Sequence, residues 1–582
     1  MSRFKLSIFA TIAPRSGAGK RRGRSMALPR VFGGPRKGLV IRLLLNGLGQ
    51  AVVAFVIAWL MRQAFTAADS TAALTAGVSL EIVGGLLLAG FTVLGLQVLE
   101  RTDSERLGQD YVMKVRLQLF QRIAAAPLRS DNPPRFGLTM TRMITDLNAL
   151  KNWVSIGVAR MAVAGVAVTG SLAALTYFNL MAAAAAAGLV TLCIGSGLLW
   201  TSALRARVQE TRRRRGELAG NLGEKMFASQ SVAHFGKIQR ECQRLRAQSR
   251  RLARAMVRRV RIASMLRSLP DAALPLSIAT IFLLAITREL AGGELVAILM
   301  LLGMITSSLR NVAQAWDFRL SFEEAHRRLT EVLSYPRLRQ AKNAVALTGD
   351  GPLSITFRNI GVADVLKRVS VTANPGERVL VTGPTGSGKS TLMALAARLL
   401  DPDCGQVLLD GQRLRDLSLA SNHRVVQLVS PKMPLLRGTV ASNVAYGSGA
   451  EDADSVARAA DLCGLDATSS LLPQGLDSQV QEKGQNLPEG VRACITLARA
   501  IVVRPRLLLI DDPTFFVDVQ AQAALRRVLA MGQATVLMTA PVDQAVFKTD
   551  RIWHLDNGQV TETIPPYQSR TVANEFGLRV LK

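Results

Sequence analysis

The sequence predicts a multi-domain protein in which an all-α transmembrane domain of six helices precedes an α/β nucleotide-binding domain of the P-loop type. Three observations predict this fold class. Apolar residues concentrate before about residue 318, which explains a mean hydropathy of +0.23 in a chain with 20% charged residues. From Pro352 onward, short Val/Ile/Leu runs alternate with helical stretches. A phosphate-loop pattern stands inside this second part. At 582 residues, the chain is too long for a single domain.

Six apolar stretches are each close to the ~20 residues that a bilayer-crossing helix requires. They cover approximately residues 39–61, 82–99, 153–178, 180–203, 270–287 and 295–315. The fourth contains MAAAAAAGLVTLCIGSGLLW, which has no polar face and is therefore not an amphipathic helix of a soluble core. Only about two residues, Phe178 and Asn179, separate the third and fourth stretches, so these two spans are expected to form a tight hairpin.

The formal charge of +30 is concentrated in segments between the apolar runs, where the positive-inside rule places basic residues. We therefore predict an integral membrane protein with both termini in the cytoplasm, and nucleic acid is not an expected partner. A bacterial inner membrane is the favoured location. Residues 1–37 are expected to form a disordered basic arm that touches membrane lipid. An organelle membrane is the alternative, because this arm also has the composition of a transit peptide.

The most informative motif is GPTGSGKST, which fits the phosphate-cradling pattern G-x-x-x-x-G-K-[ST]. A buried strand, GERVLVTG, is predicted to enter the loop and a helix, TLMALAARLL, to leave it. Glycines let backbone N–H groups point at phosphate oxygens, the lysine adds positive charge, and the serine hydroxyl binds Mg²⁺. The predicted nucleotide-binding residues are Gly383, Pro384, Thr385, Gly386, Ser387, Gly388, Lys389, Ser390 and Thr391, with Ser390 also a metal ligand.

Six spans followed by a phosphate-loop domain resemble the ATP-binding cassette (ABC) exporter family of half-transporters. The resemblance covers nearly the whole chain after residue 37. Between spans two and three, Gly137, Arg142 and Asp146 fall in step with a family stretch on a long cytoplasmic helix. The segment EEAHRRLTEVL resembles the helical linker of the family. The implied organisation is an arm at 1–37, a transmembrane domain at 38–318, a linker at 319–350, a nucleotide-binding domain at 351–565 and a tail at 566–582.

The resemblance also implies cofactors and partners. RPRLLLIDDPTFFVD looks like the second ATPase motif of the family, in which Asp511 would hold Mg²⁺, usually through water. ATP and Mg²⁺ are thus the implied cofactors. In the family, each ATP lies between the phosphate loop of one subunit and the signature segment of the other. The implied partners are a second copy in a homodimer or another half-transporter in a heterodimer, together with membrane lipid and a transported substrate that the sequence does not identify.

Five positions depart from the family pattern. Asp512 replaces the glutamate that polarises the attacking water, and being one methylene shorter it is only a weak replacement for this catalytic base. Ala540 replaces the switch histidine, and Pro431 replaces the loop glutamine that senses Mg²⁺. The signature segment reads LPEGV at residues 487–491, and residues 359–366 lack the aromatic side chain that stacks on adenine.

These losses predict binding of ATP with impaired hydrolysis. A general base contributes typically 10²–10⁴-fold and an electrostatic donor about 10²–10³-fold, which would take a typical turnover of ~10 s⁻¹ to a very low rate. Because the losses fall on both composite sites of a dimer, an intact partner would not fully restore hydrolysis. Two functions stay open: an exporter subunit with impaired hydrolysis, and a membrane pseudo-ATPase that regulates or scaffolds a partner transporter half.

Overall fold

The computed structural model describes residues 28–34, 36–69, 76–127, 142–288, 292–334, 338, 341, 343–363, 365–447, 452–465, 472–512, 516, 518–540 and 548–563. The chain divides into two compact units, one of residues 1–124 and 134–335 and the other of residues 125–133 and 336–582. The first unit is helical and the second contains the strands. Most of the predicted arm and the whole predicted tail at 566–582 lie outside the described residues.

Within the described residues, the first unit has six helices that are long and apolar enough to cross a bilayer, which confirms the prediction of six spans. Five of them are α1 (Arg36–Asp69), α2 (Ala76–Ala124), α6 (Leu180–Phe227), α8 (Ile238–Arg288) and α9 (Gly292–Leu333). The third span is built from consecutive pieces, η1 (Arg142–Asp146), α4 (Leu147–Asn152), η2 (Trp153–Gly157) and α5 (Val158–Phe178), in which η1 and η2 are π-helical turns.

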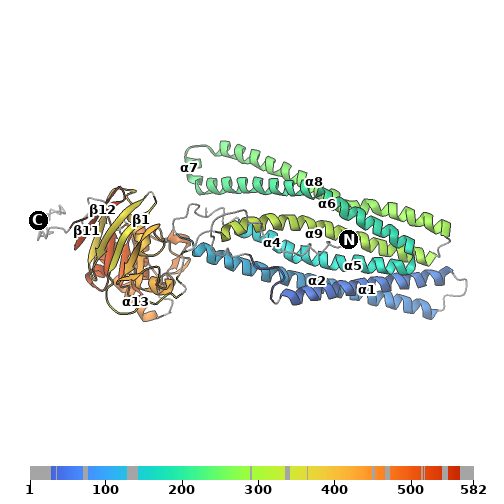
Figure 1. Ribbon diagram of the computed structural model, residues 1–582, viewed down its shortest axis with the longest axis horizontal. Helices are drawn as coiled ribbons and strands as arrows, with labels where there is room; N and C mark the ends of the chain where they lie inside the picture. The colour runs from blue at the N-terminus through green and yellow to red at the C-terminus, as the bar shows by residue number, and fades with distance from the viewer. Residues whose placement is uncertain are drawn as a thin grey trace. The chain divides into compact units, whose positions relative to one another are not determined.

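Several helices extend far beyond their apolar stretches. Helix α6 has 48 residues and α8 has 51, against the ~20 that cross a bilayer. Figure 1 shows these two helices running side by side, joined through the short helix α7 (Ser229–His234). Helix α9 likewise continues past residue 318, the predicted end of the transmembrane domain, and ends at Leu333 within the predicted linker. The polar parts of these helices form the extensions that the exporter resemblance implies.

The predicted hairpin between the third and fourth spans is confirmed. Helix α5 ends at Phe178 and α6 begins at Leu180, so Asn179 alone connects them. Its backbone is extended, and its side-chain Oδ1 accepts hydrogen bonds from the N–H groups of Met181 at 3.0 Å and Ala182 at 3.1 Å. Asn179 therefore caps α6 by satisfying two backbone donors that a helix start leaves without partners.

Residues 28–37, which the sequence analysis assigns to the basic arm, belong to the helical unit. Leu28 is buried in a cluster that also contains Leu107. Arg36 begins α1, lies 3.3 Å from the carboxylate of Asp110 and sits over the ring of Tyr111. An apolar anchor and an acidic partner hold this end of the arm against the helices, whereas the more basic residues before it lie outside the described part of the chain.

The second unit is built on two main sheets. Among the residues described, the larger sheet has six strands in the order β12 (Gln559–Thr563), β11 (Arg551–Asp556), β3 (Arg378–Thr382), β10 (Thr535–Thr539), β9 (Leu507–Ile510) and β6 (Val426–Val429). A smaller sheet contains β2 (Leu366–Ala373), β1 (Ile355–Val362), β4 (Cys404–Leu409) and β5 (Gln412–Arg413), and β7 (Gly438–Thr439) pairs with β8 (Gln479–Val480). The helices are α10 (Lys389–Ala396), α11 (Leu419–Val425), α12 (Val440–Ala445), α13 (Ala453–Leu462), α14 (Glu489–Ile501) and α15 (Val519–Ala530).

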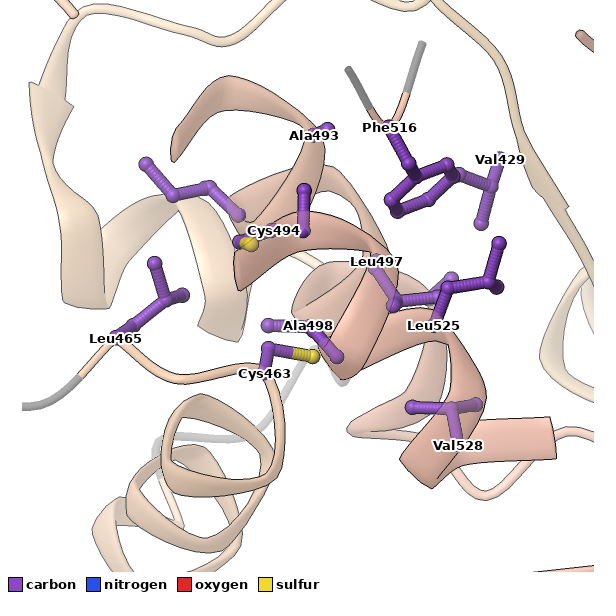
Figure 2. Close-up of a cluster of buried hydrophobic side chains, with 14 of the residues drawn as sticks. Val429, Cys463, Leu465, Ala493, Cys494, Leu497, Ala498, Phe516, Leu525 and Val528 are labelled. Carbon is purple, nitrogen blue, oxygen red and sulfur yellow. The ribbon is translucent and has the colours of Figure 1, made fainter. Parts of the chain in front are cut away.

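The centre of the larger sheet is parallel, and its strands are buried apolar runs. Every residue of β9 and of β10 is buried, as expected for parallel strands covered on both faces. Figure 2 shows part of the core beside the sheet, where Leu497 and Ala498 of α14 lie among Leu525, Phe516 and Val429. The parallel pairing of β3, β10, β9 and β6 brings their carboxyl ends to one edge. In open α/β sheets, ligands bind at this edge.

Candidate nucleotide site

The phosphate loop connects β3 to α10, as the sequence predicts. Gly383 and Gly388 both have a positive φ, +142° and +108°, a backbone conformation that residues other than glycine rarely adopt. A Cβ on Gly383 would overlap the carbonyl oxygen of Leu555, and one on Gly388 would lie 2.7 Å from Leu366 Cδ2. Glycine is therefore required at both ends of the loop by backbone conformation and by close packing, independently of any ligand.

Lys389 begins α10 and reaches back over the loop. Its Nζ donates hydrogen bonds to the carbonyl oxygens of Gly383 at 2.6 Å and Pro384 at 2.9 Å. Burial lowers the pKa of Lys389, although the carboxylates of Asp511 and Asp512 act in the opposite direction. The ammonium group is thus held beside the loop and near two acids, where a polyphosphate would meet it.

The loop carries a buried hydroxyl that fits a ligand. Ser387 is 7% exposed, and among the described residues its Oγ has no hydrogen-bond partner. Leaving a buried hydroxyl without a partner costs free energy, and a phosphate oxygen would supply the missing partner. Together with the glycine-lined cradle and Lys389, this hydroxyl suits a polyanionic nucleotide.

The residues proposed for Mg²⁺ lie together. Ser390 Oγ donates to Asp511 Oδ1 at 2.9 Å, although 121 positions separate the two residues in the chain. Hard oxygen ligands of this kind suit Mg²⁺, which takes few protein ligands and completes its shell with phosphate and water. No group of three or more His, Cys, Asp or Glu side chains able to hold a metal occurs in the part of the chain that the structure describes. The donor set therefore fits a metal that is shared with a nucleotide.

Asp512 follows directly and adopts a positive φ of +68°, a conformation that aspartate tolerates better than most residues. Its side chain is exposed, and its backbone N–H donates to Thr539 Oγ1 at 2.8 Å. The same Thr539 hydroxyl lies 3.4 Å from Asp511 Oδ1. One threonine at the end of β10 therefore connects both acids. The sequence analysis missed it because its role depends on β10 lying beside β9.

Lys432 is a second residue that the sequence analysis missed. Its Nζ lies 3.9 Å from Asp511 Oδ2, and its side chain is 70% exposed. Lys432 directly follows Pro431, the residue at the position of the family's loop glutamine. The only local signal is a lysine shortly after a predicted strand, since its approach to Asp511 depends on β6 and β9 being neighbours.

Ala540 and the signature segment lie in structurally demanding places. Ala540 is 3% exposed and its N–H donates to Val381 O at 3.0 Å, so it is packed into the core rather than presented at the surface. Pro541 lies outside the described residues. In the signature segment, Pro488 precedes the first turn of α14, which carries Glu489 exposed. A Cβ on Gly490 would overlap the carboxylate of Asp518.

The end of the loop at Gly388 packs against the β1–β2 connection and the start of β2. Val365 and Leu366 contact the position of Gly388, and Val365 also lies against Gly558. The sequence from Asn359 to Leu366 contains no aromatic residue. The side chains described at this end of the loop are therefore aliphatic, and stacking on a base is not part of what they offer.

Comparison with known proteins gives two family matches. Residues 39–309 match the ABC transporter transmembrane region, and residues 366–515 match the ABC transporter domain. Together the two matches cover more than half of the chain.

Individual relatives agree. The ABC transporter ATP-binding protein YfiB of Bacillus subtilis is 33% identical over 199 residues, covering 34% of this chain and 35% of that protein. The ATP-dependent lipid A-core flippase of Thiobacillus denitrificans is 26% identical over 493 residues, covering 82% and 85%. This chain also matches two mycobacterial multidrug efflux proteins. Its alignments to YfiB and to these two proteins span only between 19% and 35% of their lengths.

A solved bacterial Atm1-family ABC exporter with ATP bound has the same fold. The TM-score is 0.81 at 22% identity, and the match covers 90% of this chain and 94% of that one.

Proposed function

Since the chain belongs to the ABC transporter family, with a transmembrane region and an ATP-binding domain on one polypeptide, we propose that it is an exporter half with impaired ATP hydrolysis. The observation that supports this most is a contrast within one site. The loop, Lys389, Ser390 and Asp511 would form a phosphate and metal site. Asp512 and Ala540 stand where the family has its base and switch histidine, and Pro488 and Glu489 stand in the signature segment, where Pro488 replaces a serine.

Binding is assigned to the loop. The backbone N–H groups of residues 385–389 and the hydroxyl of Ser387 would bind phosphate oxygens, with Lys389 neutralising their charge. Ser390 and Asp511 would hold Mg²⁺ on the same phosphates. Bound ATP supplies the free energy of phosphoryl transfer.

Asp512 is the proposed base for ATP hydrolysis, and it is a weaker base than the glutamate of the family. Asp512 carries its carboxylate about one methylene short of a glutamate, so it holds an attacking water less closely. Its backbone N–H donates to Thr539 Oγ1, which fixes the point from which this shorter side chain extends. Glu489 places a negative charge at the first turn of α14, where a helix N-terminus would otherwise attract phosphate.

We also propose a dimeric assembly, because the chain belongs to the ABC transporter family. The active form would be a homodimer or a heterodimer with another ABC half-transporter, since the family shares each ATP between two subunits. We place it in the bacterial inner membrane with both termini in the cytoplasm, in contact with lipid and with an unidentified transported substrate.

A membrane pseudo-ATPase is the second candidate, favoured by Ala540. This residue is buried in the core of the second unit, so a surface histidine is replaced by a packed side chain rather than by a neighbour with similar chemistry. In this function, nucleotide binding would regulate or scaffold a partner transporter half.

Lys389→Ala tests the binding assignment. It is expected to weaken ATP binding at least about tenfold, because a cation beside the phosphates contributes on the order of 1 kcal/mol or more. Equilibrium dialysis of ATP against the full chain in detergent measures this, with release of inorganic phosphate followed on the same sample. Lys548→Ala, an exposed lysine of the same unit, is the matched control and should leave binding unchanged.

The same samples separate the two candidates. Slow phosphate release above the Lys389→Ala background, together with ATP-dependent movement of a fluorescent lipid or a cationic dye in inside-out vesicles, supports the exporter. Tight binding with release equal to that background supports the pseudo-ATPase. Failure of the wild-type chain to bind ATP contradicts both.

A further inference from the structure

We propose that Lys432 is a tethered cation of the nucleotide site, which neutralises Asp511 and allows ATP to bind with little dependence on Mg²⁺. The inference rests on the proposed function, because it concerns the same site. Neither the loop motif nor the family resemblance assigns a role to this lysine.

The backbone around Lys432 is held in a defined turn. Met433 N donates to Ser430 O at 3.0 Å, which closes a four-residue turn with Pro431 in its second position. Proline pre-sets the backbone angle that this position needs. The N–H of Lys432 also donates to Ser430 Oγ at 3.3 Å, and Ser430 is buried. The turn therefore fixes the direction in which the lysine leaves the sheet.

Strand order brings this turn to Asp511. The turn follows β6 directly, and β6 pairs in parallel with β9, which ends immediately before Asp511. Asp511 N donates to Val429 O at 2.9 Å, so the two strand ends are joined by a hydrogen bond. The lysine and the aspartate are consequently neighbours at the ligand edge of the sheet, although 79 positions separate them in the chain.

The two oxygens of Asp511 are divided between different partners. Oδ1 accepts from Ser390 Oγ at 2.9 Å and lies 3.4 Å from Thr539 Oγ1. Oδ2 faces the Lys432 ammonium at 3.9 Å. Asp511 is only 10% exposed, whereas Lys432 is 70% exposed. The lysine thus approaches a buried carboxylate from solvent, and its flexible stem allows it to move aside for a competing ion.

The charge balance gives the lysine its role. Asp511 and Asp512 both lie near Lys389, so two negative charges face one lysine, and a further cation would reduce their repulsion of a polyphosphate. Mg²⁺ is the usual cation in such sites. Lys432 supplies a positive charge at the same carboxylate from within the chain. An exposed pair of this kind adds little to folding stability. Its effect should therefore be seen in ligand binding.

The test is the affinity of the full-length chain for ATP, measured by equilibrium dialysis with excess EDTA and again with excess Mg²⁺. Wild type is expected to bind ATP in EDTA, and Lys432→Gln to lose roughly tenfold in affinity there. With Mg²⁺, the two proteins should agree within about threefold, because the metal then neutralises Asp511. Lys432→Arg should retain the affinity in EDTA, since it keeps the charge.

Lys548→Gln removes the same charge elsewhere in the unit and should behave as wild type, which excludes an effect of net charge. Thermal unfolding without nucleotide checks that the variants fold alike. Equal affinities of Lys432→Gln and Lys548→Gln in EDTA would overturn the inference, as would wild-type binding that disappears in EDTA. In those cases, binding with Mg²⁺ leaves the proposed function intact. No binding with Mg²⁺ would overturn both.

Discussion

At the scale of single residues, the site combines positions that tolerate change with positions that do not. Asp512 is exposed, so a larger side chain has room in solvent. Ala540 is buried in the core of the second unit, so a larger side chain there displaces its neighbours. Restoring the family residue is therefore expected to be tolerated at position 512 and to be disruptive at position 540.

Asp512→Glu is expected to raise ATP turnover, by about tenfold at most. The longer carboxylate would reach closer to an attacking water. Under the proposed function, the other departures from the family pattern keep the gain below the 10²–10⁴ typical of a complete base. Ala540→His is expected to destabilise the second unit by about 1–3 kcal/mol through overpacking. Phosphate release and thermal unfolding measure the two effects.

Asp512→Asn serves as the control, because it keeps the size and removes the charge. It should abolish the residual turnover while ATP binding is kept or becomes tighter, because the variant removes a negative charge beside the phosphates. A turnover for Asp512→Glu equal to that of Asp512→Asn would show that this position is not the base.

At the scale of helices and strands, ion pairs fix how the long helices of the first unit align. Arg212 of α6 donates to Asp146 Oδ1 at 2.8 Å, and the two side chains are 14% and 5% exposed. Asp146 is the acid of the motif that the sequence analysis compares with the exporter family. In this structure it joins the start of the third span to the polar extension of α6.

Arg212→Met is expected to destabilise the helical unit by up to about 3–5 kcal/mol, because it removes the guanidinium that donates to the buried Asp146 carboxylate. Thermal unfolding in detergent measures the loss. Arg213→Met is the matched control: Arg213 is 66% exposed and pairs only with Glu217 at 3.6 Å within the same helix, so a change below about 1 kcal/mol is expected.

Replacing both partners gives a sharper comparison. Arg212→Met combined with Asp146→Leu should recover most of the lost stability, since no uncompensated charge stays buried. If the double variant is as unstable as Arg212→Met, the ion pair is not the cause.

The sequence predicts those features that depend on local chain properties. The six spans follow from the lengths of apolar runs, and the loop at Gly383–Thr391 follows from a short motif between a strand and a helix. Lys432 beside Asp511 depends instead on strand order, and Arg212 beside Asp146 depends on how two helices align. No local pattern encodes either contact. The helix extensions carry no hydropathy signal of their own, because their sequences are polar, and the sequence predicts them only through the resemblance to the exporter family.

At the scale of the whole molecule, the distribution of basic residues predicts the orientation in the membrane. The native cysteines are suitable reporters of it. Cys242, at the start of α8, and Cys404, in β4, are exposed. Burial raises the pKa of the Cys494 thiol to about 12 and also raises that of Cys463, and Figure 2 shows both within the core. Thiols react as thiolates, so these two should be inert.

A membrane-impermeant maleimide is expected to label Cys242 and Cys404 in inside-out vesicles and to leave them unlabelled on intact cells. Mass spectrometry of the labelled peptides reads this out. Leu180→Cys provides the opposite reporter, because Leu180 is 74% exposed next to the α5–α6 turn, which the proposed orientation places outside. Labelling of Cys242 on intact cells would contradict the proposed orientation and favour the opposite one.

Gly490, in the signature segment, is a position where packing alone requires glycine. Its missing side chain leaves the space that the carboxylate of Asp518 fills, and Asp518 Oδ1 caps α15 by accepting from Ala521 N. Any larger residue at position 490 would disturb this contact, whether or not ATP is ever cleaved. A motif search would count the surviving glycine in favour of a working signature. In this protein the packing against Asp518 alone accounts for a glycine at position 490.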